Sequence, residues 1–376
     1  MVVRNSFEMN SLVVGEKMNG GFEVRAPGRV CLFGEHSDYL GLDVIAASID
    51  LVIEIVASPR EDNEIHIEYC DLGEQDRFSI DSEIEYRNKR DYIRSSFNVM
   101  RRKGFFPTQG WNIHVSGNIP IAAGLSSSSA MTVGAIMAIA EMAGKKLSTE
   151  EVALTAYEAE VAEFGESGGT MDHFASAVGG VIHIDMESMK VTKLPAELDS
   201  IVIGDSGEKK KDTVGDLRYI RTTVESEYEA IKRKISTFDH RKTPANMVYE
   251  LTQRKPSKER RMAEATLRNR DLTNQAIELL RDIKPDSYVL GEMLEEHHEI
   301  LRDDFNRSTP KIEKMIQAAM GAGAVGCKIN GSGGGGSMMA YASGWEREVA
   351  SAIQLAGGTA YIVKVSRGAS LTKVKD

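Results

Sequence analysis

Cysteine is scarce in this chain: its 376 residues include three, Cys31, Cys70 and Cys327. They lie far apart, and none has a second cysteine or a histidine at the spacing of a zinc ligand, so we expect neither a disulfide framework nor a zinc site. Chains without disulfides are typical of reducing compartments. We therefore predict a cytoplasmic location.

Long apolar runs and an excess of positive charge are also absent. No stretch reaches the roughly 18 apolar residues of a membrane span, so we expect no membrane association. Residues 1–21 lack the charged-then-apolar order of a signal peptide and are predicted to be a loosely ordered leader. The 46 Lys and Arg residues are outnumbered by 56 Asp and Glu residues, and this net charge of −10 argues against a nucleic-acid partner.

The order of secondary-structure signals indicates a mixed architecture. Short runs rich in Val, Ile and aromatic residues predict strands over much of residues 22–117. Small and apolar residues over 130–144 predict a buried helix. Ser148 and Glu151 form a capping box that starts another helix, which is expected to end at Gly165. A charged, helix-forming region follows and strand patterns return near the end, in a chain long enough for two domains.

Four consecutive serines stand at residues 126–129, within the stretch NIPIAAGLSSSSAM. Gly124 before them is able to adopt a positive φ, and the first turn of the following helix offers unpaired N–H donors and the positive end of its dipole. These features predict a phosphate-binding loop. The alternative is a helix with several N-cap serines, although one serine suffices for a cap. The lysine-containing GxxxxGK[ST] loop is absent, so the predicted cradle is of another kind.

The segment PIAAGLSSSSA, residues 120–130, resembles the second signature of the GHMP small-molecule kinases, in which a Gly- and Ser-rich loop before a helix holds the ATP phosphates. Further segments are similar to other motifs of the galactokinase branch and of the superfamily: APGRVCLFGEHSDYLG (26–41), GESGGTMDHFAS (165–176), HHEILRDDFNRSTPKIE (297–313) and CKINGSGGGGSMMAYA (327–342). The resemblance implies the α+β, two-domain GHMP kinase fold. A mixed-sheet N-terminal domain would span residues 22–195 and a helix-rich α+β C-terminal domain residues 196–376, with the active site between them.

The resemblance also implies an activity: an ATP-dependent kinase that phosphorylates the anomeric hydroxyl of a monosaccharide, galactose in the first place, to an α-sugar 1-phosphate. Asp172 matches the catalytic base of the family and Arg29 the arginine beside it. Glu160 and Ser127 match ligands of Mg²⁺, the implied cofactor. The matched ATP-binding residues are Ala123, Gly124, Leu125, Ser126, Ser127, Ser128 and Ser129. The matched sugar-binding residues are Glu35, His36, Asp38, Gly169 and Tyr219.

Each of these residues has a simpler interpretation without the resemblance. Asp172 at a helix start is an ordinary N-cap, and Arg29 in a strand is an ordinary ion-pair residue. Glu160 is a solvated helix residue, and the EHSD stretch at 35–38 is a polar turn. The sequence therefore predicts the site through the coincidence of several motifs.

The identity of the acceptor stays open. Cys31, Phe33 and Ser37 stand where galactokinases usually carry Asn, Ile and Thr, and GSGGGG at 331–336 replaces the usual GAGFGG. Another hexose or a pentose is the alternative sugar. A non-catalytic relative that senses sugar and nucleotide is a further alternative, as are more distant activities such as mevalonate or homoserine kinase. The predicted state of association is a monomer or a weak homo-oligomer.

Overall fold

The computed structural model describes residues 20–121, 123–209, 212–252 and 257–374. The predicted leader lies outside these ranges except for its last two residues. Within them, no helix combines the length and the apolar character needed to cross a lipid bilayer.

The first half of the chain builds an eight-stranded mixed sheet around a long antiparallel pair, β1 (Phe22–Phe33) and β2 (Val44–Pro59). The other strands are β3 (Glu64–Tyr69), β4 (Glu74–Ser79), β5 (Trp111–Gly117), β6 (Val181–Asp185), β7 (Lys190–Leu194) and β12 (Ser370–Lys373). The order is β12-β1-β2-β5-β3-β4, with β6 on β2 and β7 on β6. The β3–β5 pair is parallel and the others are antiparallel, which makes the sheet mixed, as predicted.

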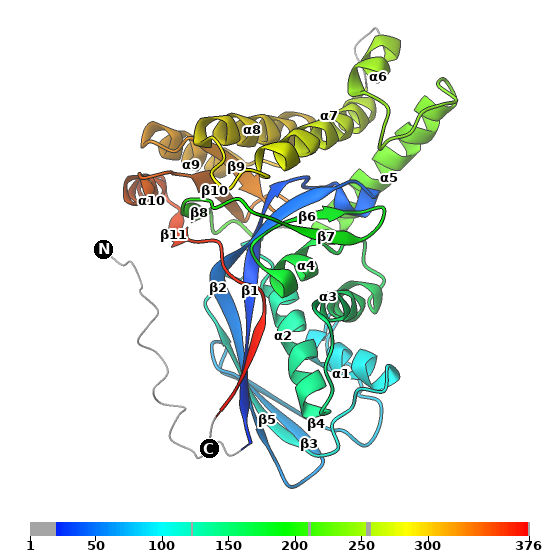
Figure 1. Ribbon diagram of the computed structural model, residues 1–376, viewed down its shortest axis with the longest axis vertical. Helices are drawn as coiled ribbons and strands as arrows, with labels where there is room; N and C mark the ends of the chain where they lie inside the picture. The colour runs from blue at the N-terminus through cyan, green and yellow to red at the C-terminus, as the bar shows by residue number, and fades with distance from the viewer. Residues whose placement is uncertain (1–19, 122, 210–211, 253–256, 375–376) are drawn as a thin grey trace.

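Helices of the first half of the chain lie on one side of this sheet in Figure 1. They are α1 (Tyr92–Arg102), α2 (Ser127–Met142), α3 (Thr149–Tyr157) and α4 (Met171–Val178). The predicted buried helix is confirmed as α2, which begins within the serine run and contacts β1 and β2. The predicted capping box of Ser148 and Glu151 is also confirmed at the start of α3. After Tyr157 this helix continues as a π-helical turn, η2 (Glu158–Ala162), to near its predicted end.

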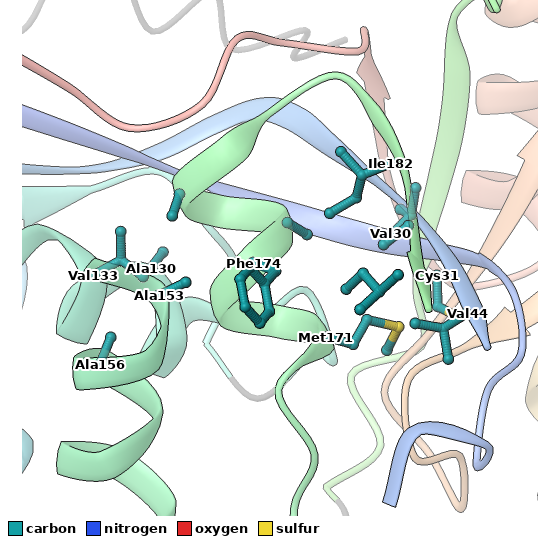
Figure 2. Packing of buried hydrophobic residues seen from close by; sticks show 14 of the residues in the cluster. Val30, Cys31, Val44, Ala130, Val133, Ala153, Ala156, Met171, Phe174 and Ile182 are labelled. Atoms are coloured by element: carbon teal, nitrogen blue, oxygen red, sulfur yellow. The ribbon is translucent and has the colours of Figure 1, made fainter. Parts of the chain in front are cut away.

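Small side chains allow α2 and α3 to approach α4 closely. Phe174 of α4 is fully buried, and Figure 2 shows it between the alanine-rich faces of these helices and the strands. The residues labelled around it are Val30, Cys31, Val44, Ala130, Val133, Ala153, Ala156, Met171 and Ile182. Removing an aromatic side chain from such a core costs about 3–5 kcal/mol. This packing fixes the orientation of α4, which carries Asp172.

The second half of the chain is helix-rich, as predicted. Its four-stranded antiparallel sheet has the order β11-β8-β10-β9 and comprises β8 (Ile201–Asp205), β9 (Gly326–Asn330), β10 (Ser337–Tyr341) and β11 (Thr359–Val363). The helical elements are α5 (Thr213–Lys232), α6 (Ala245–Thr252), α7 (Lys258–Leu279), α8 (Ser287–Glu299), the π-helical turn η3 (Ile300–Asp304), α9 (Pro310–Gly321) and α10 (Glu346–Leu355).

The end of the chain returns to the first sheet. β12 pairs with β1, and single bridges join Ile49 to Val365 and Gly179 to Arg367. The two halves of the chain are therefore connected at the C-terminal strand as well as near residue 195. The predicted division of the chain at residue 195 stays a prediction.

Candidate active site

A cleft of ≈1040 Å³ is lined by residues from both halves of the chain. Most of the site residues predicted from the sequence line this one cavity, although they come from distant segments. They are Arg29, Glu35, His36, Asp38, Gly124, Leu125, Ser126, Ser127, Ser128, Ser129, Glu160, Gly169 and Asp172.

The serine loop, residues 123–129, begins with an unusual backbone. Gly124 has the predicted positive φ, +81°, and Ser126 has φ +60°, a left-handed conformation that residues with a Cβ rarely adopt. Such conformations gather at functional sites because the surrounding structure must hold them. Ser126 occupies the N-cap position of α2, but its Oγ–H donates to Oδ2 of Asp172 at 2.7 Å. The first serine of the run therefore donates its hydrogen bond to a carboxylate of the cleft. It does not cap the helix with its side chain, so the interpretation of Ser126 as a simple N-cap is wrong.

Asp172 is held by a buried arginine. Nε–H of Arg29 donates to Oδ1 of Asp172 at 2.6 Å, and another guanidinium N–H donates to the Gly124 carbonyl at 2.7 Å. Burial disfavours the carboxylate, but the charge of Arg29 and the hydrogen bonds from Arg29 and Ser126 outweigh it, so the pKa of Asp172 lies below its ordinary value. Asp172 is therefore an anion at neutral pH.

The placement of Asp172 follows from α4. The N-cap residue of this helix is Thr170, and Asp172 is its second residue. Met171 and Phe174 point into the core in Figure 2. Asp172, which lies between them on α4, lines the cleft. Both carboxylate oxygens of Asp172 are engaged by Arg29 and Ser126, which is not the geometry of an N-cap.

Glu160 lies in the π-helical turn η2 and is buried, with 8 % of its surface exposed. Its Oε2 accepts from Nε2–H of His173 at 2.7 Å and from the Thr132 hydroxyl at 3.1 Å. Burial raises the pKa of Glu160, but the opposing effect of His173 and of the Ser128 and Ser129 hydroxyls is larger, so the pKa lies below its ordinary value. The simpler interpretation of Glu160 as a solvated helix residue is therefore wrong. Single π turns inside helices are frequent at functional sites.

These residues fit a magnesium ion that is shared with a nucleotide. The described residues contain no group of three or more His, Cys, Asp or Glu side chains able to hold a metal by themselves. Mg²⁺ is usually held by one or two carboxylates together with substrate phosphates and water. Glu160 supplies one anionic carboxylate, and Ser127 lines the same cleft with a hydroxyl. The donor set is therefore made of hard oxygen atoms, as Mg²⁺ prefers.

The EHSD stretch follows β1 and contains the short 3₁₀ turn η1 (Asp38–Leu40). His36 has φ +63°, its ring stacks on Phe305 with centroids 5.7 Å apart, and its Nδ1 lies 2.7 Å from the hydroxyl oxygen of Tyr39. Asp38 accepts from the backbone N–H of Tyr39 at 2.9 Å. Burial and the nearby charge of Asp172 raise the pKa of Asp38 to about 6. These side chains are held in fixed positions, unlike those of a solvated polar turn.

Gly169 is required by a close approach. A Cβ atom at this position would lie 1.8 Å from Oδ2 of Asp38, which is far inside van der Waals contact. The segment before α4 and the EHSD stretch therefore pack directly on each other at the cleft. The predicted substrate-binding residues Glu35, His36, Asp38 and Gly169 are brought together there.

Glu35 connects this region to the second half of the chain. One of its oxygens accepts from the Gly331 backbone N–H, and the other accepts from Nζ of Lys328, which has no exposed surface. Burial outweighs these contacts and raises the pKa of Glu35. A second link runs through Asn330, whose side chain accepts from the Cys31 N–H at 3.0 Å and donates to the Gly124 carbonyl at 2.9 Å.

Lys328 and Asn330 are absent from the site residues predicted by sequence. The signal was the presence of one lysine and one asparagine in CKIN, a strand directly before the glycine-rich segment 331–336. A fully buried strand tolerates such polar groups only where they are paired. The sequence analysis considered the glycines at 331–336 and overlooked the two polar residues that precede them.

Two predicted residues do not line the cleft in the part of the chain that the structure describes. Ala123 is buried, and its carbonyl accepts from the Ser337 hydroxyl at 2.6 Å. Tyr219 is 46 % exposed, and its ring lies 6.0 Å from Nζ of Lys258. The reason is helical geometry: Leu217, two residues earlier on α5, lines the cleft, and two residues along a helix turn the side chain by about 200°.

Family models match three parts of the chain. In chain order, the galactokinase galactose-binding signature matches residues 13–59 and the GHMP kinases N terminal domain matches residues 91–180. The model described as GHMP kinases C terminal matches residues 276–362. The order of the matches is the order of the motifs found in the sequence. They confirm the resemblance from which the site was predicted.

Known proteins of two kinds are similar to this chain. A mevalonate kinase of Pyrococcus furiosus is 32% identical over 91% of this chain and 95% of that protein. A galactokinase of Haemophilus influenzae is 30% identical over 85% of this chain and 84% of that protein. A crystal structure of Lactococcus lactis galactokinase complexed with galactose superposes with a TM-score of 0.83 at 21% identity, over 95% of this chain and 97% of that one. The last comparison confirms the predicted fold.

Proposed function

Because the chain belongs to the GHMP kinase family and is therefore an ATP-dependent phosphotransferase, we propose that its acceptor is the anomeric hydroxyl of a monosaccharide, galactose in the first place. One observation carries this proposal. The Asp172 carboxylate is fixed by Arg29 and Ser126 where the serine loop and the EHSD region reach the same cleft. A phosphate cradle and a set of sugar-binding groups therefore have a base between them.

The first chemical requirement is a base. The sugar hydroxyl would donate a hydrogen bond to Asp172 and lose its proton to that carboxylate as its oxygen bonds to the γ-phosphorus. The bond between the γ-phosphorus and the bridging β-phosphate oxygen would break at the same time, and ADP would leave. A weakly basic carboxylate suffices, because the transition state is loose and the hydroxyl loses its proton late. Asp172 is anionic at neutral pH and is therefore in the required state.

The second requirement is stabilisation of the anionic phosphoryl group. The N–H groups at the start of α2 and the serine hydroxyls would hold the phosphates, and the fixed charge of Arg29 lies next to the base. Mg²⁺, when bound by Glu160 and Ser127, would neutralise charge on the phosphate oxygens. The strong hydrogen bonds to Glu160 keep its carboxylate ionised for that purpose.

The EHSD region favours a sugar as the acceptor. Carboxylates and imidazoles in fixed positions form hydrogen bonds with hydroxyl groups of defined orientation. The galactose-binding signature matches residues 13–59, which include Glu35, His36 and Asp38. A site built in this way rejects acceptors that lack a hydroxyl by roughly 10⁴-fold. The second candidate is a mevalonate-like alcohol, which the identity to mevalonate kinases supports.

The assembled catalytic set favours an enzyme over a non-catalytic sensor of sugar and nucleotide, because Asp172, Arg29, Glu160 and the serine run all line one cleft. A cytoplasmic location and a monomeric or weakly associated state stay predictions.

The test is ADP release by the purified full-length chain with Mg²⁺ and ATP, measured against galactose, other hexoses, pentoses and mevalonate. Sugar-dependent release that disappears in Asp172→Asn, with ³¹P NMR of the product as an α-1-phosphate, is the expected result. Turnover of mevalonate alone would establish the second candidate. Saturable sugar and ATP binding with no turnover of any acceptor would identify a sensor.

A further inference from the structure

The four serines of the run at 126–129 differ in their surroundings, although all four line the cleft. Ser126 and Ser129 are buried, whereas Ser127 and Ser128 are half-buried. A hydroxyl group has one proton to donate, so each serine can donate to only one acceptor at a time. The partner of each hydroxyl therefore decides what that serine can do for a bound nucleotide.

The proton of the Ser126 hydroxyl is donated to Asp172. Oγ of Ser126 lies 2.7 Å from Oδ2 of this carboxylate, which is an anion at neutral pH. The phosphate oxygens of a nucleotide are acceptors too, so a phosphate at Ser126 would compete with Asp172 for the same proton. Ser126 has no second proton with which to bind both.

The backbone of Ser126 is consistent with this role. Its φ of +60° and ψ of +44° are left-handed, and its side chain makes no capping hydrogen bond to α2. An N-cap serine normally has extended backbone and accepts from an N–H of the first turn. The N–H groups at the start of α2 are therefore left for another acceptor, such as a phosphate.

Two further hydroxyls of the run serve the other carboxylate of the cleft. Ser128 and Ser129 hydrogen-bond to Glu160, which also accepts from the Thr132 hydroxyl at 3.1 Å. The Ser127 hydroxyl makes no side-chain hydrogen bond to any residue that the structure describes. It is thus the hydroxyl of the run that a nucleotide can use without taking a proton from a carboxylate.

The Asp172 carboxylate is held on both of its oxygens. Nε–H of Arg29 donates to Oδ1 at 2.6 Å, and Ser126 donates to Oδ2. The other ionisable groups that act on Asp172 are Asp38, a second carboxyl group, and His173, whose Nε2 lies 2.7 Å from Glu160. Donors on both oxygens fix the plane of the carboxylate, and Ser126 supplies the one on Oδ2.

We infer that Ser126 is a positioning residue for Asp172 and is not a ligand of the nucleotide. The inference rests on the proposed role of Asp172 as the base, and it narrows the part of the serine hydroxyls in phosphate binding to Ser127. Held by Arg29 and Ser126, the carboxylate presents a fixed lone pair to the acceptor hydroxyl. It takes the proton of that hydroxyl as the oxygen bonds to the γ-phosphorus and the bond to the bridging oxygen of the departing ADP breaks.

The test uses Ser126→Ala and Ser126→Gly in the full-length chain, with Mg²⁺, ATP and the acceptor that gives the highest kcat/KM. Both variants lack the hydroxyl, and glycine also adopts a positive φ without strain, so it keeps the test open if the alanine variant folds poorly. In both, kcat is expected to fall by about tenfold or more, as for the loss of a hydrogen bond to a charged group.

Nucleotide affinity separates positioning from phosphate binding. Isothermal titration calorimetry with Mg²⁺ and a non-hydrolysable ATP analogue should give a Kd within about twofold of that of the unaltered chain for both Ser126 variants. Ser127→Ala is the matched comparison, and its Kd is expected to rise by about tenfold, because it removes a hydroxyl that the nucleotide can use.

A rise in Kd in the Ser126 variants as large as that in Ser127→Ala would overturn the inference, since Ser126 would then bind phosphate. An unchanged kcat in both variants would overturn it, and so would a loss confined to one of them, which would assign the effect to the backbone. The proposed function survives these outcomes if Asp172→Asn abolishes turnover. Full turnover in Asp172→Asn, or no turnover of any acceptor by the unaltered chain, would overturn the proposed function and the inference together.

Discussion

Nε–H of Arg29 donates to Oδ1 of Asp172 at 2.6 Å, although 143 positions separate the two residues in the sequence. The side chain of Arg29 is 6% exposed, so this pair is largely removed from water. The same guanidinium binds the Gly124 carbonyl. One planar cation therefore fixes Asp172, the proposed base, and the start of the serine loop relative to each other.

Arg29→Lys is expected to lower kcat by about 10²-fold, because a single ammonium group lacks the fork of donors that reaches Asp172 and Gly124 together. The KM for the sugar should change much less. The weaker contact should also let the pKa of Asp172 rise, which moves the acidic limb of the kcat profile to higher pH. A profile that keeps its position while kcat falls would show that Arg29 does not set the state of Asp172.

Asp38 predicts the pH dependence of acceptor binding. Its pKa is about 6 in the folded chain, so it loses its negative charge as the pH falls through 6. The KM for the sugar should therefore rise below about pH 6, while kcat, which depends on Asp172, should hold to lower pH. Steady-state kinetics from pH 5 to pH 8 measure both. In Asp38→Asn the KM should be high and should no longer respond to pH in this range.

Asp38 should also influence stability. Its folded pKa lies above the ordinary carboxyl value, so the folded chain binds more protons than the unfolded chain between about pH 4 and pH 6, and stability falls as the pH rises through that window. Asp38→Asn removes this effect. Its unfolding midpoint, relative to that of the unaltered chain, should therefore increase more at pH 8 than at pH 4. The opposite order would contradict the raised pKa.

The sequence predicted those parts of the site that lie in continuous motifs. The serine run, the EHSD stretch and the segment around Asp172 could be recognised because each keeps its residues within a few positions of one another. The two-domain α+β fold was implied by the resemblance that these motifs carry, and the strand and helix patterns alone indicated only a mixed architecture. The return of β12 to the first sheet could not be predicted, because strand pairing between residues 22–25 and 370–373 leaves no local signal.

Helix faces were harder to predict than helices. Glu160 reaches the cleft from a π turn, which alters the ordinary helical spacing, so its position in the sequence gave no direction for its side chain. Tyr219 was predicted from a motif and not from the face of α5, and the structure places it outside the cleft among the described residues. Lys328 was missed because its role depends on Glu35, which is 293 positions away.

The buried pair of Lys328 and Glu35 predicts a strong coupling. Lys328→Met leaves the Glu35 carboxylate buried without its cation and is expected to lower the free energy of unfolding by about 3–5 kcal/mol. The double variant Lys328→Met with Glu35→Gln should recover part of that loss. Urea unfolding of the two single variants and the double variant measures the coupling. Additive losses would show that the two residues act independently.

Metal dependence should identify the role of Glu160. Removing divalent cations with EDTA should abolish ADP release, and added Mg²⁺ should restore it. Glu160→Gln keeps the shape of the side chain but removes its charge, so the Mg²⁺ concentration for half-maximal rate should rise by about tenfold or more. Titration of the rate with Mg²⁺ at saturating ATP measures this shift.

Glu163 provides the matched control for that experiment. It lies three residues further along, and its carboxylate accepts from the Tyr86 hydroxyl at 2.5 Å and pairs with Arg102. Because these contacts engage it outside the lining of the cleft, Glu163→Gln should leave the Mg²⁺ requirement unchanged even if it lowers stability. Equal shifts in both variants would mean that the lost charge acts at long range. A shift in Glu160→Gln alone would assign the cation to the carboxylate that His173 and Thr132 hold in place.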